Sequence, residues 1–223
     1  MKNGLSKTII KRVVIFIVTV VVLTLIIFAI VDNAPESPAY AEAAKPVIYL
    51  YPEEPIEINV VLNFDGILEF TYPLYNDGWV VTAYPDGTLI NHADEREYSY
   101  LFWEGHSKTE YDMSKGFVVK GEDTVVFLQD TLAFMGLIPR EYNEFIVFWL
   151  PFMQNNAYNL IAFQDEAYTE TAELIITPEP DSVLRVFMAF KPLVKFVEIE
   201  EQVIAPFTRE GFTAIEWGGA NLG

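Results

Sequence analysis

An uncharged apolar stretch near the N-terminus, residues 13–31, limits what this chain can fold into more than any other feature. Thr19 and Thr24 are its only polar members. As an α-helix rising about 1.5 Å per residue it would be roughly 28 Å long, close to the ~30 Å hydrocarbon core of a bilayer. A helix of a soluble core would carry a polar stripe, and this stretch has none. The sequence therefore predicts a transmembrane helix over residues 13–31.

The charges before this stretch predict its orientation. No acidic residue occurs before Asp32, and four basic residues precede residue 13: Lys2, Lys7, Lys11 and Arg12. By the positive-inside rule, residues 1–12 face the cytoplasm and the rest of the chain lies outside a cell membrane that residues 13–31 cross once. The stretch is also longer than the apolar region of a signal peptide, which favours an uncleaved anchor. Small residues allow an alternative, secretion after cleavage near Ala41 or Ala43.

The remaining chain divides into a linker and a domain. Residues 32–44 contain Pro35 and Pro38 and are predicted to be an extended linker. The domain, residues 45–219, is long enough to bury a core. The chain has no cysteine, which excludes disulfides, thiolate nucleophiles and cysteine-bound zinc.

The charge of the domain side of the chain excludes one class of partner. All 32 acidic residues and 10 of the 14 basic ones follow residue 31, a net charge of 10 − 32 = −22. Such a surface repels nucleic acid, so no nucleic-acid partner is expected.

Alternation of apolar and polar residues predicts strands over most of the domain. Turn residues predict hairpins at Asp65-Gly66, where a bulged loop would set Leu62 opposite Leu68, at residues 85–87 and at residues 178–181. The predicted strands are residues 45–52, 56–62, 67–72, 79–84, 88–91, 97–104, 145–150, 158–164, 172–177, 183–190 and 211–217.

Helical signals are confined to the middle of the chain. Residues 122–135 begin with acidic side chains, repeat apolar residues at helical spacing and are followed by Gly136, which predicts a helix. Residues 139–144 are predicted as a short second helix. The fold class predicted is α+β: an N-terminal transmembrane helix followed by a mainly antiparallel, β-rich extracytoplasmic domain. Its N-terminal half would be β-sandwich-like and its C-terminal half α+β, and both one continuous unit and a seam near residues 105–116 fit.

The strand predicted over residues 97–104 supplies a candidate binding site. Alternation places Tyr98, Tyr100 and Phe102 inward, which leaves Trp103 on the polar side. An exposed tryptophan requires a cover or a ligand, and strand ends often carry recognition groups. Trp103, Glu104 and His106 are therefore predicted to form a shallow surface site. Packing of Trp103 under a neighbouring element is the alternative.

No reaction centre is evident. His92 and His106 are the only histidines and lack metal-ligand spacing, so neither a metal site nor a cofactor is predicted, and no catalytic residue is assigned. A carboxylate pair for glycoside cleavage could come from a set of six acids. These are Glu104, Glu110, Asp112, Glu144, Asp165 and Glu216.

Several ordered motifs resemble an uncharacterised family of bacterial surface proteins. The motifs are KPVIYLYP at 45–52, NDGW at 76–79, PDGT at 85–88, YLFWEG at 100–105, EFIVFWLP at 144–151, RVFMAF at 185–190 and EWGG at 216–219. The resemblance implies a domain that follows a signal or anchor segment and extends over nearly all of 45–219. It implies no activity, ligand or catalytic residue.

The sequence leaves three classes of function open. A binding or interaction module at the cell surface, with a glycan or a protein as partner, is favoured because the scaffold is well built and carries no recognisable reaction centre. A glycan-active extracytoplasmic hydrolase that uses a carboxylate pair is the second class. A structural or regulatory membrane-proximal domain is the third.

Overall fold

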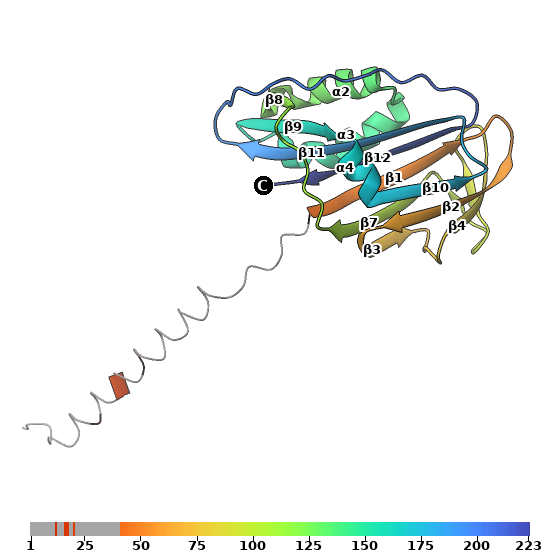
Figure 1. Cartoon of the computed structure of the whole chain (residues 1–223), viewed down its shortest axis with the longest axis horizontal. Helices are drawn as coiled ribbons and strands as arrows, with labels where there is room; N and C mark the ends of the chain where they lie inside the picture. The colour runs from red at the N-terminus through yellow and green to blue at the C-terminus, as the bar shows by residue number, and fades with distance from the viewer. Residues whose placement is uncertain (1–11, 13–15, 18–19, 21–40) are drawn as a thin grey trace, which may run out of the picture. The chain divides into compact units, whose positions relative to one another are not determined.

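The computed structural model describes residues 41–223 together with residues 12, 16, 17 and 20 (Figure 1). Within these residues no helix is long and apolar enough to cross a membrane. This finding overturns the transmembrane helix in the predicted fold class. Phe16, Ile17 and Val20 are helical, while the rest of residues 13–31, and residues 32–40 of the predicted linker, lie outside the described residues. Strand pairing starts at Ala41, four residues before the predicted domain start at Lys45.

Residues 40–223 form one compact unit, and the strands described in it make two sheets (Figure 1). Among the described residues, the larger sheet has seven strands in the order β3-β7-β1-β12-β11-β9-β8. They are β1 (Ala41–Tyr51), β3 (Gly66–Tyr72), β7 (Leu101–Ser107), β8 (Phe117–Lys120), β9 (Tyr158–Gln164), β11 (Ser182–Leu193) and β12 (Thr213–Asn221). The smaller described sheet has five strands in the order β10-β2-β4-β5-β6. They are β2 (Ile56–Phe64), β4 (Trp79–Ala83), β5 (Leu89–Asn91), β6 (Glu97–Tyr98) and β10 (Ala172–Thr177).

The predicted mainly antiparallel, β-rich fold is confirmed, but its division into two halves is wrong. Of the described strand pairs, only β11 and β12 run parallel. β1 pairs with β7 on one side and with β12 on the other, so β3, β7 and β1 from the N-terminal half continue directly into β12, β11 and β9 from the C-terminal half within one sheet. A sandwich half and an α+β half therefore do not exist as separate pieces.

Two helices cover one face of the larger sheet (Figure 1). The helix predicted over 122–135 is confirmed as a 3-10 turn, η1 (Gly121–Asp123), followed by α2 (Thr124–Met135), which Gly136 ends in a left-handed conformation. The strand predicted over 145–150 is wrong, because α3 (Pro139–Met153) continues through it. Phe145, Trp149 and Met153 lie four residues apart and are all buried, which is the spacing of one helix face. A third, short helix, α4 (Glu166–Thr171), precedes β10.

One of the three predicted hairpins is confirmed. β4 and β5 pair around residues 85–87, with Ala83 opposite Leu89 and Gly87 at a φ of 87°. The hairpin at Asp65-Gly66 is wrong, because β2 belongs to the smaller sheet and β3 to the larger one. The hairpin at residues 178–181 is wrong for the same reason, since it joins β10 to β11. Both turns carry the chain from one sheet to the other.

Two hydrophobic cores fill the spaces between these layers. The first lies between the sheets and includes Trp79 and Trp103. The second lies between the larger sheet and the helices and includes Trp149 and Trp217. The order of layers is therefore smaller sheet, larger sheet, helices.

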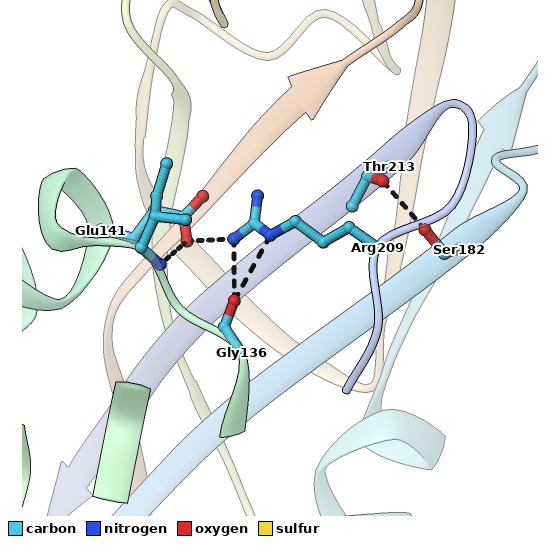
Figure 2. Close-up of polar contacts among 6 residues, drawn as sticks. Gly136, Glu141, Ser182, Arg209 and Thr213 are labelled. Carbon is cyan, nitrogen blue, oxygen red and sulfur yellow. Dashed lines mark hydrogen bonds and ion pairs between the residues drawn. The ribbon is translucent and has the colours of Figure 1, made fainter. Parts of the chain in front are cut away.

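The segment 194–212, between β11 and β12, runs over the helix layer (Figure 1). Arg209 fastens its end, donating to the carbonyl oxygen of Gly136 and forming an ion pair with Glu141 (Figure 2). Glu141 is fully buried and also accepts the backbone N–H of Ile138, at the start of α3. One carboxylate thus begins a helix and anchors the segment that crosses it.

A second buried ion pair lies between the sheets. Arg185 on β11 and Glu216 on β12 are register partners, and Arg185 Nε lies 2.6 Å from Glu216 Oε2. The Trp103 indole N–H donates to Glu216 Oε1 over 3.1 Å. Burial opposes the charge of Arg185, but the interactions with Glu216 and Tyr168 together outweigh it, so the pKa of Arg185 is raised. The guanidinium also lies 4.7 Å from the centre of the Tyr168 ring. Both carboxylate oxygens of Glu216 are thus bound inside the core between the sheets, which indicates a structural role.

Candidate binding face

Trp103 does not form the surface site predicted for it. β7 alternates strictly, with Leu101, Trp103 and Gly105 buried between the sheets. Trp103 has no exposed surface; its ring lies 4.9 Å from that of Phe64, and its N–H is bound by Glu216. The structure instead agrees with the alternative prediction, in which Trp103 packs under neighbouring residues.

The prediction failed because residues 97–104 are not one strand. β6 ends at Tyr98 in the smaller sheet and β7 begins at Leu101 in the larger one. Two residues of irregular backbone lie between them, so alternation counted from Tyr98 does not carry over to Trp103.

The other two predicted residues, Glu104 and His106, share the opposite face of β7 with Phe102. β3 pairs antiparallel with β7 and sets Tyr72 opposite Phe102, Phe70 opposite Glu104 and Ile67 opposite His106. Directly paired residues project from the same side of a sheet. We call the surface made by these six residues the β3–β7 face.

Three large apolar side chains of this face are more than half exposed. Ile67, Phe70 and Tyr72 have 59%, 55% and 55% of their surface accessible, although large apolar residues at three successive outward positions normally face a cover. Phe70 packs on Phe102, with 5.7 Å between ring centroids. β3 is also an edge of the larger sheet, at the end away from β8 (Figure 1).

Close packing beneath β3 and β7 fixes the geometry of this face. A side-chain carbon added at Gly105 would lie 2.7 Å from the carbonyl oxygen of Ile67 and 2.5 Å from the Phe64 ring. Only glycine lets the two strands and that ring approach so closely. The glycine of the YLFWEG motif is thus required under the face, while the motif's tryptophan lies in the core.

Charged groups border the apolar residues. His106 Nε2 lies 3.0 Å from the carboxylate of Glu69, which sits where the β3–β7 register shifts. Glu104 accepts the backbone N–H of Lys45 over 3.3 Å. Lys45 has a φ of 52°, which is uncommon for a residue with a side chain, at a register shift in β1. Glu104 therefore holds the β1 backbone as well as bordering the face.

An open hollow of about 500 Å³ adjoins the Ile67 end of the face. Its wall carries three hydroxyl groups in a hydrogen-bonded row, Ser107 to Thr109 over 2.9 Å and Thr109 to Thr171 over 2.7 Å. Asp65 and Lys108 complete its polar lining. This row of hydroxyl groups could hydrogen-bond polar groups at one end of a polymer bound along the β3–β7 face.

Two of the six carboxylates considered for catalysis are engaged by other side chains. Glu216 is buried and bound by Arg185 and Trp103. Glu144 accepts the hydroxyl of Tyr49 over 3.0 Å, and burial, followed by the charge of Glu144, raises the pKa of that hydroxyl. Among the described residues, no group of three histidine, aspartate or glutamate side chains is placed to hold a metal ion.

Sequence reasoning missed the apolar part of this face. Residues 67–72 do not alternate regularly, because the β3–β7 register shifts around Glu69. As a result, the outward-facing apolar residues are Ile67, Phe70 and Tyr72, which are not evenly spaced along the strand. The sequence signal for this irregularity is a break in the alternation of apolar and polar residues just after Asp65-Gly66.

The fold and this face define a class: an α+β domain of three layers with an apolar, acid-bordered edge strand. No family model matches the chain, and comparison with solved structures gave no match. A relative from Butyrivibrio fibrisolvens, described as an uncharacterized protein in the bglA 3' region, is 40% identical over 87 residues. Those residues cover 37% of this chain and 88% of the relative. The chain belongs to the same family as that protein.

Proposed function

We propose that the domain is an extracytoplasmic binding module that holds an extended polymer against the β3–β7 face. The observation that carries the proposal is the run of Ile67, Phe70 and Tyr72, each more than half exposed, on an edge strand. Exposed apolar residues bordered by charged groups are typical of recognition surfaces. The basic residues before an apolar stretch at the N-terminus support a place outside the cytoplasm.

A matched pair of substitutions tests the proposal. Phe70 on β3 and Phe134 on α2 are both 55% exposed. Replacing either with alanine removes the same surface and should change the free energy of unfolding similarly and little. The wild-type protein and both variants are screened against peptidoglycan, soluble glycans, and basic and acidic polypeptides.

Binding that Phe70→Ala abolishes and Phe134→Ala leaves intact supports the module. Retention of every ligand by Phe70→Ala refutes it and leaves a structural or regulatory role. Of the six carboxylates considered for a glycan-active hydrolase, Glu216 and Glu144 are already engaged with Arg185 and Tyr49.

A further inference from the structure

β3, the edge strand of the β3–β7 face, indicates which class of polymer this face would bind. We infer that β3 accepts an extended polypeptide segment rich in lysine and arginine as an additional strand of the larger sheet. This inference rests on the proposed function and names the partner of the same face.

The free edge of β3 favours a polypeptide over a glycan. In the part of the chain that the structure describes, β3 is hydrogen-bonded to β7 alone, so its outer backbone groups have no strand partner. At about 3.3 Å per residue, Gly66–Tyr72 offers roughly 23 Å of edge. An added strand binds such an edge through its own N–H and C=O groups, which a glycan lacks in this periodic arrangement.

The exposed side chains lie where an added strand would use them. Alternate side chains of the incoming segment would project on the side that carries Ile67, Phe70 and Tyr72. Long aliphatic stems of lysine or arginine cover such side chains while their cationic ends reach the ring faces or neighbouring acids. The apolar surface left uncovered by the domain would then be buried.

Charge selects a basic partner. Residues 46–95, which include β3, contain nine acidic residues and neither lysine nor arginine. They are Glu53, Glu54, Glu57, Asp65, Glu69, Asp77, Asp86, Asp94 and Glu95. Edge strands are commonly protected by lysine, whereas β3 carries Glu69 as its only charge. The whole chain has a net charge of −18, so a basic partner is attracted at long range and a second copy would bring two acidic surfaces together.

The probe is a synthetic peptide of alternating lysine and valine, long enough to span β3, added to the full chain. Binding is followed by fluorescence anisotropy. We expect Phe70→Ala and Glu69→Lys each to weaken it by roughly tenfold or more. Phe134→Ala and Glu179→Lys are the matched controls. Both residues are exposed, Phe134 on α2 and Glu179 in the connection between β10 and β11, and both variants should leave affinity within about twofold.

A second peptide tests strand addition itself. Methylating two consecutive central amides removes hydrogen-bond donors from both edges of the peptide and keeps its charge. We expect it to bind roughly tenfold or more weakly than the parent. Hydrogen exchange should show new protection in residues 66–72 with the parent peptide only.

The outcomes separate the inference from the proposed function. Equal binding of both peptides, or no new protection in residues 66–72, overturns strand addition. Phe70-dependent binding of a glycan or an acidic polypeptide, without binding of the lysine–valine peptide, refutes the basic partner and keeps the module. If sedimentation equilibrium shows dimers of the wild-type chain and monomers of Phe70→Ala, the partner that occupies β3 is a second copy of the chain. Absence of any Phe70-dependent ligand refutes both proposals.

Discussion

Replacing Arg185 with methionine should be among the most destabilising single changes in the domain. Glu216 has 1% of its surface exposed, and Arg185 is its only charged partner among the described residues. Methionine keeps most of the volume of the side chain but leaves a buried carboxylate without a charged partner among the described residues, although it still accepts the Trp103 N–H. Removing one member of a buried pair costs about 3–5 kcal/mol. Loss of the contact with the Tyr168 ring adds to this.

The double variant Arg185→Met/Glu216→Gln separates the charge from the packing. Glutamine can still accept the Trp103 N–H, and no uncompensated charge remains. A buried pair replaced as a whole is often neutral, so the double variant should recover all but about 1–2 kcal/mol of the free energy of unfolding.

Equilibrium urea unfolding, followed by tryptophan fluorescence, measures these free energies. Trp103 touches the perturbed carboxylate and reports on the same site. A loss below about 1 kcal/mol for Arg185→Met would show that Glu216 is not held as a buried charge. Additive losses in the double variant would show that the two side chains are not coupled.

Three further changes test other parts of the structure. Trp103→Ala should cost about 3–5 kcal/mol in the same urea assay, because the residue has no exposed surface; an exposed tryptophan would cost little. Gly105→Ala should cost about 1–3 kcal/mol, since the new methyl group meets the Phe64 ring, and a neutral result would mean that the strands can separate there. The hydrogen bond from Tyr98 to Asp94, then burial, raises the pKa of Tyr98 to about 12, so stability from this bond is present below pH 10 and lost as pH rises through about 12. In near-UV absorbance, Tyr98→Phe should lose one phenol from the titration near pH 12 relative to the wild-type protein, and loss of a phenol from the titration near pH 10 instead would contradict the contact.

Local signals in the sequence were reliable where local chemistry decides the structure. β9 has the bounds predicted for it, residues 158–164, and α2 ends where Gly136 takes a left-handed conformation. The hairpin at residues 85–87 follows from a proline and a glycine within three residues. In each case the deciding atoms lie within a few residues of one another.

Other features depended on contacts that the sequence does not display. Residues 145–150 are a continuous apolar run, which suits a buried strand or a buried helix equally. Packing of Phe145 and Trp149 against the larger sheet decides for the helix. Asp65-Gly66 has the composition of a hairpin turn, yet β2 and β3 find better partners in different sheets. The candidate site failed at Trp103 for the same reason, although Glu104 and His106 do lie at the exposed face.

The pairing of β1 with β12 has a consequence for the order in which the domain can form. β1 is the first strand of the domain to be synthesised and β12 is the last, and the two are neighbours within the larger sheet. A growing chain that ends before residue 213 has no β12, so β1 lacks one of its two neighbouring strands. Arg185 also lacks its ion-pair partner Glu216, and the core on the helix side lacks the indole of Trp217. Sheets closed by such distant segments form late and slowly. Chains stalled just short of β12 should therefore remain protease-sensitive along their whole length, and should gain resistance together once residues 213–221 are added.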